Sequence, residues 1–169
     1  SIPSENLVSS FLRMTELQRI LQRLDALSTT DGSSGVLATL VTVAGSSYRR
    51  PGARLLYLPD GHRIGSISGG CFEEDVLARA ARVAATGVAE LATYDTTAEN
   101  DLVWGVGMGC HGIVRVLIEK LPPRPAWTAV LADNFAARRA AALEVVHRTG
   151  HEKPLGTRLA AAGGSTPTA

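Results

Sequence analysis

The stretch Ser66-Ile67-Ser68-Gly69-Gly70-Cys71-Phe72-Glu73-Glu74-Asp75 joins two hydrophobic patterns, and the rest of the chain is organised around it. A strand-like run ends in the paired glycines, and a helical pattern starts directly after the cysteine. Paired glycines let a backbone turn sharply and approach a ligand without Cβ clashes. A thiol at the start of a helix lies near unpaired N–H groups, which favour the thiolate. Cys71 is therefore predicted either to face a ligand or to fill a small space in the core.

Strand and helix patterns alternate on both sides of this turn. Thr15 and Gln18 predict the capping box of an early helix, and Gly87 is the expected stop of the helix that follows the turn. The turn signal Pro59-Asp60-Gly61 predicts a hairpin. The expected fold class is α/β: a small mixed β-sheet domain flanked by helices, with a C-terminal helical appendage. The predicted strands cover residues 36–43, 53–58, 62–67, 88–94 and 113–118, and the first and last of these are rich in β-branched residues.

The proline-rich run Leu121-Pro122-Pro123-Arg124-Pro125 is the predicted boundary of the domain. Residues 1–14 are expected to form a loose N-terminal arm and residues 15–121 the domain itself. Residues 122–169 are expected to form a linker, an Ala- and Arg-rich helix over residues 134–147, and a disordered tail.

Composition limits the classes of function. The 169 residues carry a net charge of +1, with 45% hydrophobic and 20% charged residues, so overall charge favours neither nucleic acid nor a membrane surface. No apolar run reaches the ~20 residues of a membrane span. Two cysteines far apart argue against a disulfide framework, and we expect a cytoplasmic protein. The motifs of P-loop kinases, nucleophile-elbow hydrolases and HExxH metalloproteases are absent from the sequence.

The loop Gly45-Ser46-Ser47-Tyr48-Arg49-Arg50-Pro51-Gly52, followed by Arg54, carries two serine hydroxyl groups and three guanidinium groups. Arginine forks match phosphate oxygens bidentately, so this Ser/Arg loop predicts recognition of an anionic ligand. The alternative is a basic turn that only faces solvent.

A second glycine-dense segment ends in Gly109-Cys110-His111-Gly112 and leads into a predicted strand. Residues 107–112 fit the letters of the dinucleotide pattern G-x-G-x-x-G, but that fingerprint needs a helix where this chain has a strand. Cys71 and Cys110 are candidate soft metal ligands, although the chain has no CxxC spacing and the metal is left unknown. The acidic run Glu73-Glu74-Asp75 fits recognition of a cation or a ring nitrogen, or N-terminal capping, better than a bare phosphate.

Four motifs follow one another along the chain: a GSSxRxPGAR loop, an SGGCxE turn, a Tyr-Asp pair, and a GxGCxG segment leading into a strand that ends in glutamate. They occupy residues 45–54, 68–73, 94–95 and 107–119. Together they resemble the N-terminal domain of the XdhC and CoxI family, maturation factors for xanthine and carbon-monoxide dehydrogenases. The resemblance covers about residues 30–120.

The resemblance implies a protein that binds molybdenum cofactor (molybdopterin), protects it and delivers it to a xanthine- or CO-dehydrogenase-type molybdenum hydroxylase. It implies a chaperone rather than an enzyme, with no catalytic residue. The implied partners are the apo-hydroxylase and the proteins that make or sulfurate the cofactor, and a homodimer is left open. The cofactor-binding positions carried over from the motifs are Ser46, Ser47, Arg49, Arg54, Gly69, Gly70, Cys71, Glu73, Gly109 and Cys110.

The chain departs from the family pattern in three ways. Tyr48 stands where the family usually has proline, and His111 stands where it usually has a second glycine. Members generally carry a C-terminal Rossmann domain, which we expect to be absent here. Two other classes of function are kept: a small thiol- or nucleotide-dependent oxidoreductase that needs Cys71, and a non-catalytic dimerising module whose cysteines lie in the core.

Overall fold

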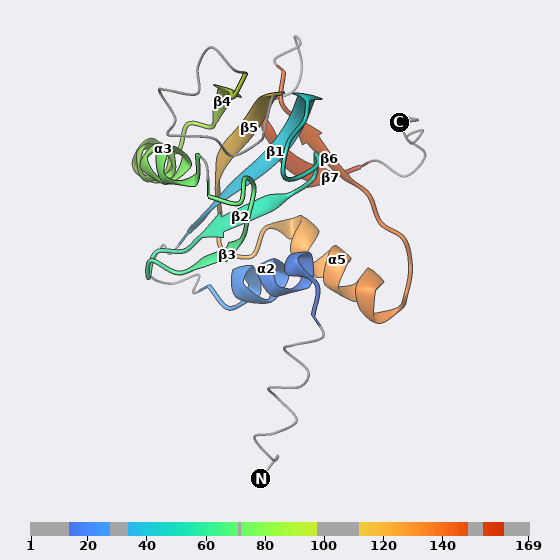
Figure 1. Cartoon of the computed structure of the whole chain (residues 1–169). Coiled ribbons are helices and arrows are strands. Elements are labelled where there is room, and N and C mark those ends of the chain that lie inside the picture. Colours follow the sequence, from blue (N-terminus) through green and yellow to red (C-terminus); the bar gives the residue numbers. More distant parts are fainter. Residues whose placement is uncertain (1–13, 28–33, 71, 98–111, 149–153, 161–169) are drawn as a thin grey trace, which may run out of the picture.

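The computed structural model describes residues 14–27, 34–70, 72–97, 112–148 and 154–160. In this part of the chain, five strands form one sheet in the order β3-β2-β1-β5-β4, and two further strands pair separately (Figure 1). The strands of the large sheet are β1 (Gly35–Gly45), β2 (Arg54–Tyr57), β3 (Arg63–Gly65), β4 (Glu90–Asp95) and β5 (Gly112–Leu121). The remaining elements are the helices α2 (Glu16–Asp25), α3 (Glu73–Thr86) and α5 (Ala126–Ala136) and the strands β6 (Leu143–Val146) and β7 (Gly156–Leu159).

The predicted α/β class is confirmed, and the sheet is antiparallel in every described pairing rather than mixed. The reason is connectivity. Hairpins join β1 to β2 and β2 to β3, and α3 then carries the chain across to β4, which pairs antiparallel with β5. The helix ends follow the local signals: Thr15 and Gln18 form the predicted capping box, and Gly87 ends α3 in the left-handed conformation at φ +72°.

The sheet separates two apolar clusters, because successive side chains of a strand point to opposite faces. Leu55 packs on the side of α3 together with Val76 and Val83. Its neighbour Leu56 packs on the other side, with Leu24 of α2. The fold therefore has three layers: α3, the sheet, and a layer that contains α2 and α5.

The prediction of a helix over residues 134–147, beyond the prolines, is wrong. The helix is Ala126–Ala136, and residues Leu143–Val146 form β6, which pairs with β7. Trp127 and Leu131 are buried in the same cluster as the apolar side chains of α2. This burial explains why the helix begins at Ala126, before the Ala-rich segment for which it was predicted. No helix in the described part of the chain combines the length and the apolarity needed to cross a bilayer.

Candidate functional site

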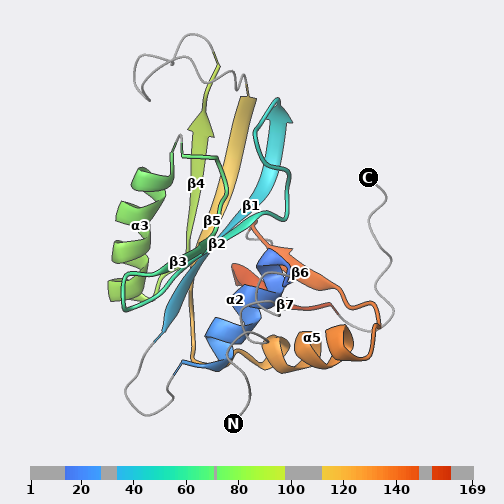
Figure 2. The same cartoon turned by 60° about the horizontal axis from the view of Figure 1, so that its bottom comes forward.

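Segments from all four motifs reach the same end of the sheet, which we call the loop end. There β1 ends at Gly45, paired with Gly112, the first residue of β5, and β4 ends at Asp95, paired with Ile113. The β3 strand also ends toward this side, at Gly65, and the SGG turn (residues 66–70) follows it. Figure 2 shows β1, β4 and β5 extending together to this end. Motifs far apart in the sequence are thus gathered by antiparallel pairing.

Glu73 holds the SGG turn in shape. Its Oε1 atom accepts hydrogen bonds from Ser66 Oγ at 2.7 Å, from the Ile67 amide at 3.0 Å and from the Ser68 amide at 3.2 Å. Burial alone would raise the pKa of Glu73, but these hydrogen bonds outweigh it and keep the pKa below its ordinary value. The first glutamate after the turn therefore acts as an internal acceptor that fixes the backbone from which Gly69 and Gly70 project.

Tyr48 joins the Ser/Arg loop to the SGG turn. A Cβ atom placed on Gly69 would lie 2.9 Å from Cδ1 of the Tyr48 ring, so the ring packs directly on the glycine α-carbon. The Tyr48 side chain is nevertheless 71% exposed. Gly70, at φ +112°, is exposed, and no described residue has an atom within 4 Å of a Cβ atom placed there. The turn is therefore backed by an aromatic ring at one glycine and accessible at the next.

Gly112 brings the start of β5 against the backbone of the Ser/Arg loop. A Cβ atom placed on Gly112 would lie 2.7 Å from the Ala44 carbonyl oxygen and closer still to that of Ser46. The Thr96 amide and hydroxyl both donate to the Gly112 carbonyl at 2.9 Å. These contacts hold the ends of β1, β4 and β5 together at the loop end.

The two thiols predicted to face a ligand, those of Cys71 and Cys110, lie outside the described residues, and so do Gly109 and His111. Whether the two sulfur atoms share one site stays a prediction. Among the described residues, no three His, Cys, Asp or Glu side chains are grouped so as to hold a metal ion.

The two arginines of the predicted set lie close to α2. Arg49 donates from one Nη atom to both carboxylate oxygens of Glu16, at 3.0 and 3.2 Å. Arg54 begins β2 next to Leu55, whose side chain faces α3, so Arg54 faces the layer of α2 and α5 instead. Burial lowers the pKa of Arg54 more than Glu119 and Glu16 raise it. Arg54 therefore lies on the side of the sheet that α2 and α5 cover.

Tyr94, from the Tyr-Asp motif, supports α3 from inside the fold. Its ring stacks on Phe72 with centroids 4.4 Å apart, and its hydroxyl donates to Asp75 Oδ2 at 2.7 Å. Arg79 also donates to Asp75, at 2.6 Å, and forms a close ion pair with Glu90. Burial and the Asp75 hydrogen bond together raise the pKa of Tyr94. The sequence did not reveal this network, although Asp75 and Arg79 at i, i+4 spacing signal its first pair.

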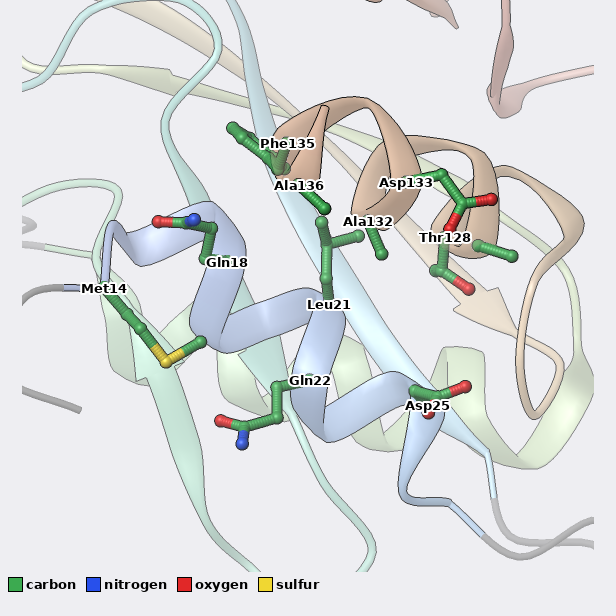
Figure 3. Close-up of a pocket in the computed structure, with 11 residues that line it drawn as sticks. Met14, Gln18, Leu21, Gln22, Asp25, Thr128, Ala132, Asp133, Phe135 and Ala136 are labelled. Atoms are coloured by element: carbon green, nitrogen blue, oxygen red, sulfur yellow. The ribbon is translucent and has the colours of Figure 1, made fainter. Parts of the chain in front are cut away.

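A groove of about 440 Å³ runs between α2 and α5 (Figure 3). Leu21 of α2 and Ala132 of α5 point toward one another across it, and Asp25 and Asp133 lie along its sides. None of the predicted cofactor positions that the structure describes lines this groove.

The geometry defines a class of protein: an α/β domain that presents glycine-rich loops at one end of an antiparallel sheet. The model of the XdhC and CoxI family matches residues 29–95, which include the Ser/Arg loop, the SGG turn and the Tyr94-Asp95 pair. This part of the chain is similar to the XdhC and CoxI family, and the predicted resemblance is confirmed.

Two relatives illustrate the match. A Bacillus subtilis (strain 168) protein described as a probable subunit of xanthine dehydrogenase is 47% identical over 98 residues, which are 58% of this chain and 29% of that protein. A crystal structure described as a xanthine dehydrogenase from Bacillus halodurans is 35% identical, with a TM-score of 0.56 over 73% of this chain and 35% of that chain. This chain spans about a third of the length of either protein.

Proposed function

We propose that this chain binds and protects molybdenum cofactor and delivers it to a xanthine- or CO-dehydrogenase-type molybdenum hydroxylase. The similarity of residues 29–95 to the XdhC and CoxI family supports a role in dehydrogenase maturation. The Bacillus subtilis relative, described as a probable part of xanthine dehydrogenase, supports a dehydrogenase as the partner. The chain acts as a carrier in this proposal, and the cofactor supplies molybdenum redox chemistry only in the enzyme that receives it.

The observation that carries the proposal is the convergence of the Ser/Arg loop and the SGG turn at the loop end. Tyr48 packs on Gly69, and the Ser46 carbonyl packs on Gly112, so the loops are held in register with β5. Pre-organised loops of this kind lower the entropy cost of binding a rigid ligand.

The described residues fit the chemical parts of molybdopterin. Ser46, Ser47 and Arg49 offer hydroxyl and guanidinium donors for a terminal phosphate. The exposed Tyr48 ring offers a flat surface for the fused ring system. The open α-carbon of Gly70 lets a ligand approach the turn, and Cys71 follows it directly in the sequence. Glu73 would act indirectly, since its Oε1 atom already holds the turn.

Co-purification tests the proposal. The chain is purified from cells that make molybdenum cofactor, and bound pterin is released and measured by fluorescence after oxidation. We expect the wild-type chain to carry pterin, and Cys71→Ala and Cys110→Ala variants to lose most of it. A His62→Ala variant is the control, because this side chain is 74% exposed on the β2–β3 hairpin turn. A wild-type chain without pterin contradicts the proposal, and unchanged pterin in both cysteine variants removes the thiols from the site.

Delivery needs a separate measurement. The pterin-loaded chain is mixed with apo-hydroxylase, and transfer is followed as loss of pterin from the chain and gain of activity by the hydroxylase. Loss of pterin without gain of activity would contradict delivery while leaving binding intact.

A further inference from the structure

A second cavity, of about 390 Å³, is lined by residues of α2, β2 and α5 and of the segment that follows α5. Leu17 of α2 and Leu131 and Phe135 of α5 form apolar walls. Arg54 of β2 and Arg139, which follows α5, also line it. A mostly apolar cavity with a few convergent polar groups is the usual form of a small-molecule site.

One of the hydrogen-bond donor atoms of Arg54 has no acceptor among the described residues. Its Nη1 atom donates to the Gly52 carbonyl at 2.9 Å, but its Nε atom is buried and has no partner among the described residues. Buried polar atoms are nearly always satisfied, so the unpartnered Nε atom of a residue that lines the cavity points to a group that completes it.

The nearby carboxylates are already engaged by other donors. Glu16 receives two hydrogen bonds from Arg49. Glu119 is buried and accepts from the Thr157 amide at 2.9 Å and from the Thr157 hydroxyl at 2.5 Å. Both acids act on Arg54 through charge, yet the structure shows no hydrogen bond from Arg54 to either within the described residues. Arg54 therefore has carboxylates nearby but no carboxylate hydrogen-bond acceptor among the described residues.

Arg139 is a second cation at the same cavity. Its Nε atom donates to Asn134 Oδ1 at 3.1 Å, and no ion pair to it is formed within the described residues. Two guanidinium groups on one cavity favour a ligand with a carboxylate or phosphate group.

We infer that this cavity binds a small organic anion, with its carboxylate or phosphate between Arg54 and Arg139 and its apolar body against Leu17, Leu131 and Phe135. The site goes beyond the proposed cofactor function, because neither the SGG turn nor Ser46, Ser47 or Arg49 of the Ser/Arg loop lines this cavity.

Titration calorimetry at low salt tests the inference with benzoate and phenyl phosphate as the two head-group probes. Benzyl alcohol, which lacks the charge, and inorganic phosphate, which lacks the apolar body, are the matched comparisons. We expect the aromatic anions to bind at least about tenfold more tightly than benzyl alcohol, the factor expected for one charged hydrogen bond worth about 1.5 kcal/mol. The better of the two anions identifies the head group. Equal binding of benzyl alcohol, or no binding of either anion, overturns the inference.

Variants assign the binding to this cavity. Arg54→Met should weaken the aromatic anions about tenfold or more. Arg139→Gln should weaken them measurably and keeps the test open if Arg54→Met fails to fold, because Arg139 is exposed. Arg138→Gln is the control, since Arg138 is the exposed neighbour of Arg139 and does not line the cavity. Equal effects of the Arg138 and Arg139 substitutions on anion binding would overturn the site. The amount of pterin that co-purifies with Arg139→Gln should stay unchanged, because this site is separate from the proposed cofactor site.

Discussion

Replacing Glu73 by alanine should release the SGG turn. The substitution removes the acceptor of three hydrogen bonds, from Ser66 Oγ and from the amides of Ile67 and Ser68. The two amides would then lose their hydrogen-bond acceptor, and water could not easily replace it because Ile67 and Ser68 are buried. The turn would lose the contact that sets its backbone relative to α3.

The size of the effect follows from these three bonds. Each contributes about 1 kcal/mol net, and the partial exposure of the carboxylate reduces the sum to about 2 kcal/mol. For a chain of this length, such a loss lowers the melting temperature by about 4–8 °C. Thermal unfolding followed by circular dichroism measures it. Glu74→Ala is the matched control. The neighbouring Glu74 side chain is 80% exposed, and within the described part of the chain it pairs with Arg63 alone, so its loss should cost less than about 0.5 kcal/mol.

The pH dependence gives an independent check on Glu73. Its pKa is below the ordinary value of 4.5 in the folded chain, so its contribution is fully present above about pH 4.5 and is lost as the pH falls through the folded pKa. The stability gap between wild type and Glu73→Ala should therefore be widest near pH 7 and should narrow in acid. A gap no larger than that of Glu74→Ala at pH 7, or one that does not narrow in acid, would refute the reasoning.

Three further substitutions test the loop end and its support. Gly69→Ala places a Cβ atom 2.9 Å from the Tyr48 ring at a residue with φ +71°. Denaturant unfolding should show a loss of about 1–3 kcal/mol in the free energy of unfolding. The double variant with Tyr48→Ala should recover only the part of this loss that comes from the clash with the ring. Gly112→Ala meets the backbone carbonyls of Ala44 and Ser46, which cannot move aside like a side chain, so the same measurement should show a larger loss than for Gly69→Ala. Tyr94→Phe removes the hydrogen bond to Asp75 and should cost about 1–2 kcal/mol, with a rise in the Asp75 pKa that NMR titration detects.

Sequence patterns predicted the parts of the fold that depend on neighbouring residues. The capping box of Thr15 and Gln18, the stop at Gly87 and the hairpin around Pro59 are all set within a few residues, and all three occur in the structure. The prediction of secondary structure is wrong where pairing with a distant segment determines the conformation. Residues Leu143–Val146 continue an Ala-rich run that favours helix, but pairing with β7 makes them a strand. A helix propensity of a few tenths of a kcal/mol per residue is easily overridden by such pairing.

The candidate site divides in the same way. The SGG turn and the helix after it were predicted from the glycines and the acidic run, because both signals are local. The sequence does not reveal that Glu73 is the acceptor for the turn, because the amides that it reaches precede it and are placed by the fold. The packing of Tyr48 on Gly69 could not be predicted, since it depends on how β1 and β3 place their loops.

The partners of the two arginines could not be predicted from the sequence. Arg49 and Arg54 look equivalent in the GSSxRxPGAR motif, yet Arg49 pairs with Glu16, which is 33 residues away, and Arg54 points into another cavity. A phosphate at the loop end therefore has to compete with the Glu16 carboxylate for Arg49. The Arg49–Glu16 pair is partly exposed, with side-chain exposures of 33% and 27%, and pairs of this kind are worth about 0–1 kcal/mol. Under the proposed function, a doubly charged phosphate can take Arg49 from Glu16 at small cost, so the ion pair would hold the loop in place before the cofactor arrives without blocking its binding.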